Sequence, residues 1–162
     1  MKRFLCLAIG LSISVPAMAL DSSLFAPTLP SEPTCETSDT SCIIIVQNQS
    51  YDLDEYGAFN FIGIPEDSRC PLDAVCVWAG RVRVELKHDY SSTSEKFEIG
   101  LGGDLKTQWI DPQTGLKLSL EQVWPEKILS VPNPEPYRIK LRVEAVDSAT
   151  ADQLADDESP VQ

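Results

Sequence analysis

The sequence predicts an all-β fold, an antiparallel β-sandwich or partly open barrel of six to eight strands that is braced by disulfides. Apolar and polar residues alternate through most of the central region, which is typical of strands with one buried and one wet face. Gly- and Pro-rich turns separate these segments at short spacing. A convincing amphipathic helix is missing, and at most one helical turn is expected, within Ser119–Trp124.

The expected strands follow one another from residue 43 to residue 145. The first is a short β-branched run, and the later ones place apolar residues at every second position. A turn over Asp111–Gly115 separates two of them. In chain order, the predicted apolar faces are Ile43–Val46; Phe59 and Phe61; Val82, Val84 and Leu86; Phe97 and Ile99; Leu105 and Trp109; Leu116, Leu118 and Leu120; and Tyr137, Ile139, Leu141, Val143 and Ala145.

Residues 1–19 have the three parts of a secretory signal peptide. Two basic residues are followed by the apolar run Phe4–Val15, and Ala17 and Ala19 supply the small residues that a signal peptidase requires. The run is too short to cross a bilayer, and no later segment approaches the necessary length. We therefore expect an exported protein without a stable membrane anchor. Cys6 should leave with the signal peptide.

Cleavage before Leu20 would leave 143 of the 162 residues and change the net charge from −12 to −14, because two basic residues leave. We expect a Pro/Ser/Thr-rich extended lead-in over residues 20–42 and one β domain over residues 43–146. Residues 147–162 hold five acidic residues and no basic or aromatic ones, so they should form an acidic disordered tail. The chain as a whole has 25 acidic and 13 basic residues, and this excess of negative charge excludes a typical nucleic-acid-binding surface.

The mature chain would keep four cysteines, Cys35, Cys42, Cys70 and Cys76. An even number of cysteines in an exported chain predicts two disulfides formed in an oxidising compartment, the periplasm or the extracellular medium. Three pairings are possible. We favour Cys35–Cys42 and Cys70–Cys76 because each closes a short local loop, which would stabilise the fold by roughly 2.5 kcal/mol.

The segment Asp67–Gly80 begins Asp-Ser-Arg-Cys-Pro and ends Cys-Val-Trp-Ala-Gly. These 14 residues resemble a signature of many small secreted bacterial proteins of unassigned function, some of which are lipoproteins. The resemblance implies a bacterial exported domain and brings no catalytic residues with it. This chain lacks the lipidated cysteine of the lipoprotein members, so the resemblance does not imply membrane attachment.

The same segment has a structural interpretation. Arg69 beside Asp67 predicts a forked ion pair, Pro71 shapes the loop that Cys76 closes, and Trp78 is expected to cover the disulfide with a buried ring. On this interpretation, Asp67, Arg69 and Trp78 form a compact structural element that fixes the conformation of the loop. The alternative is that the segment is a binding loop.

Metal binding and cofactor chemistry have little support in the sequence. Asp52–Gly57 begins like a calcium loop, but Tyr56 occupies its fifth position and Gly63 stands where the bidentate Glu is required. This segment is better explained as a solvated turn. A zinc site would need reduced cysteines, which conflicts with oxidation. We expect no metal and no cofactor.

The sequence gives equally little support for a group of catalytic residues. His88 shares the parity of the apolar residues of its strand and should be a packed edge residue. No Gly-x-Ser-x-Gly elbow occurs, and nothing shows that carboxylates such as Asp52 and Asp54 converge. Gly100–Gly103 matches one short motif of the chagasin-type protease inhibitors, but the other two motifs of that family are absent, so a turn is the simpler explanation.

Three functions remain open. We favour a non-enzymatic, monomeric domain that binds an unknown ligand in or beyond the bacterial envelope. The second is a protease inhibitor that presents the Cys70–Cys76 loop, since a rigid loop is preorganised for a cleft. The third is a hydrolase whose acid–base groups would come from Asp52, Asp54, Asp67 and Asp73.

Overall fold

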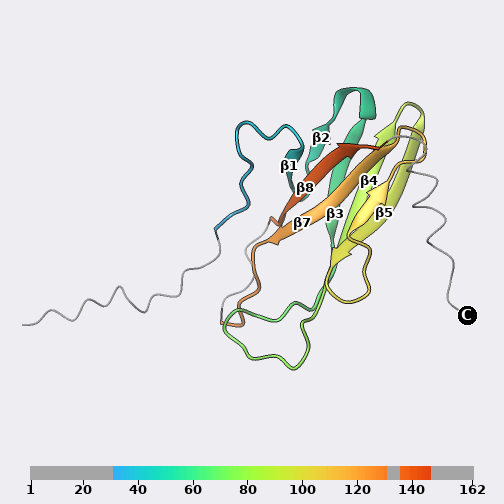
Figure 1. Cartoon of the computed structure of the whole chain (residues 1–162). Helices are drawn as coiled ribbons and strands as arrows, with labels where there is room; N and C mark the ends of the chain where they lie inside the picture. Colours follow the sequence, from blue (N-terminus) through green and yellow to red (C-terminus); the bar gives the residue numbers. More distant parts are fainter. Residues whose placement is uncertain (1–30, 131–135, 147–162) are drawn as a thin grey trace, which may run out of the picture.

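The computed structural model describes residues 31–130 and 136–146, which form two four-stranded antiparallel sheets packed as a sandwich (Figure 1). One sheet has the order β1-β8-β7-β6 and the other β2-β3-β4-β5. The strands are β1 (Cys42–Val46), β2 (Ser50–Asp52), β3 (Ala58–Asp67), β4 (Val82–Tyr90), β5 (Thr93–Leu101), β6 (Gln108–Ile110), β7 (Leu116–Trp124) and β8 (Arg138–Ala145). The predicted disulfide-braced all-β sandwich is confirmed, and its sheets stay open instead of closing into a barrel.

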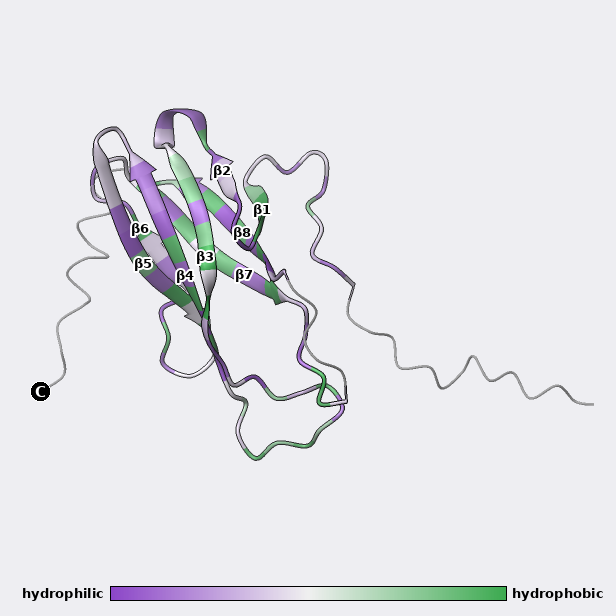
Figure 2. Cartoon of the chain, turned by 180° about the vertical axis from the view of Figure 1, so that it is seen from behind, coloured by the Kyte–Doolittle hydropathy of each residue, from purple (hydrophilic) through white to green (hydrophobic). Residues whose placement is uncertain are grey.

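The core lies between the two sheets and is built from the alternating positions that the sequence marks as apolar. In β4, burial alternates residue by residue from Val82 to His88. The coloured strands of Figure 2 show the same alternation of hydrophobic and hydrophilic residues. The buried core residues are Ile43, Ile45, Phe59, Phe61, Val82, Val84, Leu86, Phe97, Ile99, Leu116, Leu118, Leu120, Val123, Ile139 and Leu141.

The segment Ser119–Trp124, where at most one helical turn is expected, contains no helix and is the second half of β7. Leu120 pairs with Leu141 and Gln122 pairs with Lys140, so Glu121 is an extra residue in a β-bulge. A bulge reverses the inward–outward alternation of a strand. Leu120 and Val123 therefore both face the core although they are three residues apart, a spacing that in the sequence resembles a helix.

The strand expected around Leu105 and Trp109 is shorter than its apolar pattern suggests, since β6 includes only Gln108–Ile110. The residues before it connect the two sheets instead. The Gly100 N–H donates to the Lys106 carbonyl at 2.8 Å, and the Leu120 N–H donates to the Thr107 carbonyl at 2.8 Å. This segment thus runs along one side of the sandwich and bonds to both sheets.

Strand β2 was not predicted from the sequence. Its three residues are all exposed and show no apolar alternation. The strand is recognised only by its pairing with residues 58–60 of β3. A short 3-10 helix, η2 (Asp54–Tyr56), follows it.

The ends of the chain fall largely outside the described residues. The expected signal peptide, residues 1–19, and the expected acidic tail, residues 147–162, are not described, and the lead-in is described only from residue 31. The Cys35–Cys42 disulfide ties the end of the lead-in to the first residue of β1. In the part of the chain that is described, no helix has the length and apolar character needed to cross a membrane.

Two long loops project from the same end of the sandwich (Figure 1). One joins β3 to β4 over residues 68–81, and we call it the tip loop. The other follows β7, and its described part, residues 125–130, is called the facing loop. Both lie at the end of the molecule opposite to η2, as Figures 1 and 2 agree.

Candidate functional site

The tip loop leaves the sandwich through a closed neck. The Ser68 N–H donates to the Arg81 carbonyl at 2.8 Å, and the Arg81 N–H donates to the Ser68 hydroxyl oxygen at 3.2 Å. Gly80 has a φ of +70°, and a Cβ there would lie 2.0 Å from the Ser68 carbonyl oxygen. Only glycine fits at this point, because the two ends of the loop approach each other so closely.

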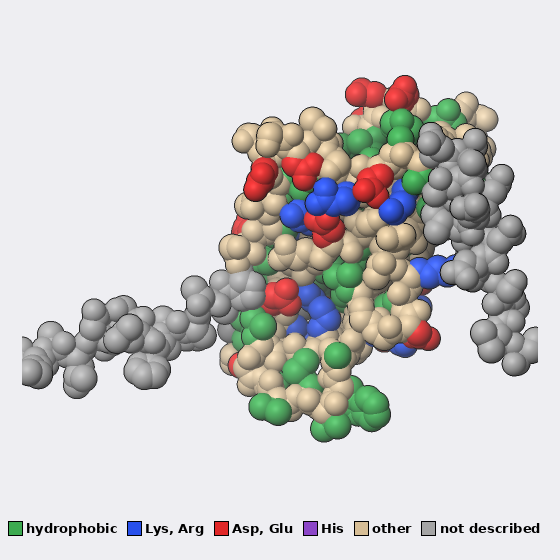
Figure 3. Space-filling model, in the orientation of Figure 1, with side chains coloured by type: hydrophobic (Ala, Val, Ile, Leu, Met, Phe, Trp, Pro, Cys, Tyr) green, Lys and Arg blue, Asp and Glu red, His purple; other side chains and the backbone are tan. Residues whose placement is uncertain are grey.

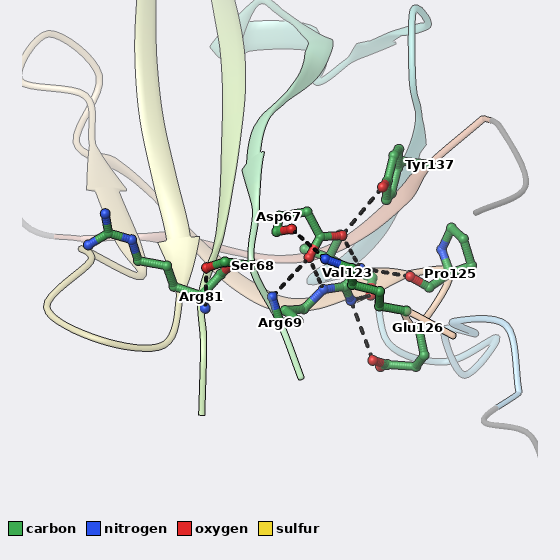
Figure 4. A network of polar contacts seen from close by, with 9 residues as sticks. Asp67, Ser68, Arg69, Arg81, Val123, Pro125, Glu126 and Tyr137 are labelled. Atoms are coloured by element: carbon green, nitrogen blue, oxygen red, sulfur yellow. Dashed lines mark hydrogen bonds and ion pairs between the residues drawn. The ribbon is translucent and has the colours of Figure 1, made fainter. Parts of the chain in front are cut away.

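Arg69 holds the first turn of the tip loop against the end of β7 (Figure 4). Its Nε and Nη2 atoms donate to the two carboxylate oxygens of Asp67 at 2.9 and 2.7 Å, which confirms the predicted forked ion pair. Nη1 donates to the Val123 carbonyl and Nη2 to the Pro125 carbonyl, both at 2.8 Å. One guanidinium thus connects the tip loop to the start of the facing loop, with Glu126 at 3.4 Å.

Asp67 is a largely buried carboxylate whose charge is compensated locally. Its side chain is 10% exposed, and the Tyr137 hydroxyl donates to it at 3.3 Å. Burial raises the pKa of Asp67, but the hydrogen bonds and positive charge of Arg69 more than offset this effect, so the pKa lies below its usual value. The carboxylate is therefore charged near neutral pH and acts as a fixed anchor for Arg69.

Asp73 makes a second connection between the loops. Its carboxylate accepts the Leu129 N–H at 2.7 Å and the Ser130 N–H at 3.1 Å. The hydrogen bond from Leu129 is the main reason that the pKa of Asp73 is lowered. The Leu72 N–H donates to the Lys127 carbonyl at 2.9 Å, so the two loops also share a backbone hydrogen bond.

Both predicted disulfides are confirmed. Cys35 is bonded to Cys42, and Cys70 is bonded to Cys76 with 5.9 Å between their Cα atoms. The second bond closes a small ring within the tip loop. Together with the neck, Arg69 and Asp73, it holds the loop at several points without help from a hydrophobic core.

The most distinctive feature of this end is its exposed apolar surface. Among the described residues, six large hydrophobic side chains are exposed, and five of them lie on the tip loop and the facing loop. Figure 3 shows hydrophobic side chains gathered at this end. We call this surface the apolar tip, and its members are Leu72, Val75, Val77, Trp78 and Leu129.

The expected position of Trp78 is wrong. Its side chain is 83% exposed, so the ring neither packs in the core nor forms a buried cover for the Cys70–Cys76 disulfide. Polar and charged contacts carry out the structural role that we assigned to it. The structure thus brings Asp67 and Arg69 together as predicted, but places Trp78 outside their cluster.

His88 is a packed residue, as its parity predicts. It is 4% exposed, and its ring stacks on Phe59 with 4.3 Å between the ring centres. Its Nε2 lies 2.8 Å from the Tyr56 carbonyl oxygen, which can only accept a hydrogen bond, so Nε2 carries the proton.

The calcium-like segment and the glycine run form turns. Asp52 accepts the Asp54 N–H at 3.1 Å, and Gly57 ends η2 with a φ of +81°. Gly102 and Gly103 follow β5 with positive φ values. Among the described residues, no group of three or more His, Cys, Asp or Glu side chains is arranged to hold a metal ion.

The four carboxylates considered for hydrolysis do not share a site. Asp52 lies beside η2, at the opposite end of the sandwich from the loops (Figure 1). Asp67 is paired with Arg69, and Asp73 binds backbone N–H groups of the facing loop. Asp52 and Asp54 therefore lie at the opposite end of the sandwich from Asp67 and Asp73.

Comparison of the chain with family models, with curated proteins and with solved structures gave no match. The function of this site must therefore be inferred from its geometry alone. Sequence reasoning missed the partners from the far end of the chain, namely Tyr137, Leu129 and the carbonyls of Val123 and Pro125, because nothing local marks contacts across more than 50 residues.

Proposed function

We propose that this chain is an exported domain, periplasmic or secreted, that binds a partner through the apolar tip and catalyses no reaction. The observation that carries the proposal is the concentration of exposed apolar side chains on two loops held by polar contacts. Exposed apolar side chains gathered in one patch commonly mark an interaction site. Tryptophan is a frequent energetic anchor of such surfaces.

The frame of the loops supports this assignment. A loop that keeps its bound shape before contact loses little conformational entropy on binding. Here the disulfide, the Arg69 fork and the Asp73 hydrogen bonds fix the loop while they leave the side chains of Val75, Val77 and Trp78 free for contact. Two disulfides also indicate an oxidising, extracytoplasmic compartment.

The test is affinity capture from an envelope extract of the cells that make the protein, with proteins and lipids both quantified. The bait is the mature chain, compared with a tip variant that combines Val75→Ser, Val77→Ser and Trp78→Ser. Tyr51→Ser is the matched control, since it removes the sixth exposed hydrophobic side chain, which lies on β2. We expect the native chain and the control to retain a component that the tip variant loses. Equal recovery on all three baits would contradict the proposal.

A second candidate is protease inhibition through the same surface. The specific observation in its favour is that the tip loop projects from the sandwich and is closed by a disulfide. Replacement of residues 72–75 should then abolish slow-dissociating inhibition in a panel of purified proteases. Absence of inhibition by the native chain would remove this candidate.

A further inference from the structure

We propose that the apolar tip inserts into the interfacial region of a zwitterionic phospholipid bilayer. This inference rests on the proposed function, that the tip is a contact surface, and adds the chemistry of the partner. The contact is reversible and peripheral, and it is made by side chains of the tip loop.

The pattern of exposure favours a fluid partner. All five consecutive residues from 75 to 79 are exposed, so neither the sandwich nor the facing loop covers this part of the tip loop. In a protein–protein interface, a few anchor residues carry most of the binding energy. An apolar liquid surrounds a protruding loop on every side, so it can bury Val75, Val77 and Trp78 together.

The charges around the tip also favour entry into a medium of low polarity. No charged residue lies between Asp73 and Arg81 in the sequence. The Asp73 carboxylate accepts backbone hydrogen bonds from the facing loop, and Arg81 pairs with Glu66 at 2.7 Å. Insertion of residues 74–80 therefore desolvates no ionised side chain, which would otherwise be the largest cost.

Trp78 suits the boundary between headgroups and acyl chains. Its large ring gains from apolar surroundings while its N–H group can still reach water or a headgroup oxygen, and tryptophan is enriched at membrane–water interfaces for this reason. The rigid frame keeps the aliphatic side chains beside it exposed, so they are available to the same layer.

The charge distribution selects the lipid class. The chain has a net charge of −12, and three exposed acidic residues, Asp52, Asp54 and Glu55, lie at the end opposite to the tip. An anionic leaflet would repel such a molecule as a whole. Zwitterionic headgroups impose no such repulsion, and an uncharged tip gives them the favoured point of contact.

The experiment measures flotation of the full mature chain with phosphatidylcholine vesicles, with and without a minor fraction of phosphatidylglycerol. We expect the native chain and Tyr51→Ser to float equally, and partitioning of the triple-serine tip variant to fall by at least about tenfold. Added phosphatidylglycerol should weaken binding at low salt, and salt should restore it. Stronger binding to the anionic vesicles would overturn the proposal. Melting curves of all variants verify that they are folded.

A conservative variant adds a positional readout. Trp78→Phe keeps an apolar ring and should still float, while quenching of tryptophan emission by brominated lipid should be lost, because Trp109 and Trp124 belong to the sandwich. Unchanged quenching would overturn insertion at this site. If no variant floats but a protein is captured through the tip, the proposed function stands and the bilayer inference fails. If neither vesicle binding nor tip-dependent capture occurs, both fail.

Discussion

Replacement of Arg69 by Met tests whether the polar frame holds the loops. Methionine keeps most of the side-chain length but removes every donor. The change would delete two hydrogen bonds to Asp67 and two to the carbonyls of Val123 and Pro125. It would also leave the Asp67 carboxylate without its guanidinium partner, in a position where only 10% of the side chain is exposed.

The size of the effect follows from this burial. Removal of one member of a buried ion pair typically costs 3–5 kcal/mol, mainly because the other charge stays desolvated. Here Tyr137 still donates to Asp67, and the Lys127 ammonium, bonded to the Asp67 carbonyl at 3.0 Å, remains nearby. We therefore expect Arg69→Met to lower the free energy of unfolding by about 3 kcal/mol, at the lower end of that range.

The assay is a double-mutant cycle with Asp67→Asn, followed by denaturant unfolding. Because Asp67→Asn removes the stranded charge, the double variant should recover part of the loss, and the coupling energy should exceed about 1 kcal/mol. A loss below about 1 kcal/mol for Arg69→Met, or strict additivity of the two changes, would refute the reasoning. Either result would mean that the fork contributes little and that the disulfide, the neck and the Asp73 hydrogen bonds fix the loop.

The pH dependence gives an independent test of the same pair. The folded-state pKa of Asp67 is lowered, so the stabilising effect of the pair is fully present above the unfolded pKa of about 3.9. It is lost as the pH falls through the lower, folded value. The stability difference between the native chain and Arg69→Met should therefore narrow in strongly acidic solution, as measured by unfolding at a series of pH values.

Five further outcomes are expected. Trp78→Ala should change the free energy of unfolding by less than about 0.5 kcal/mol, since the ring is exposed. Paired Cys70→Ser and Cys76→Ser changes should cost about 2–4 kcal/mol. This cost should add to that of Trp78→Ala within about 0.5 kcal/mol; stronger coupling in denaturant melts would place the ring on the disulfide. Deletion of residues 147–162 should leave Tm unchanged, and a fall of several degrees would show that this segment docks. The intact mass of the exported protein should place its first residue at Leu20; a mass that retains Cys6 would contradict cleavage there.

The fold was largely predictable because burial in a sandwich leaves a period of two in the sequence. Strands β4 and β8 have one buried face and one polar face, and both were placed correctly. The failures occurred where pairing, and not burial, defines the element. Strand β2 has no buried residue, and the bulge at Glu121 is visible only through its partners on β8.

The candidate site was predictable only in its local contacts. Asp67 and Arg69 are two residues apart, and the disulfides close loops of six and seven residues, so chemistry and short spacing sufficed. The facing loop comes from another part of the chain, and its position depends on the packing of β7 and β8. No local pattern indicates that Leu129 meets Asp73.

The error over Trp78 has a physical cause that also explains the site. The sequence predicts a buried tryptophan beside the disulfide, because apolar side chains usually stabilise a fold by leaving water. In this loop, ionic and backbone hydrogen bonds provide the structural contacts, so the apolar residues are not needed for them. We therefore expect different residues to determine the stability of the loop and its binding to a partner. Changes at Arg69 or Asp73 should lower the free energy of unfolding. Changes at Val75, Val77 or Trp78 should alter binding alone.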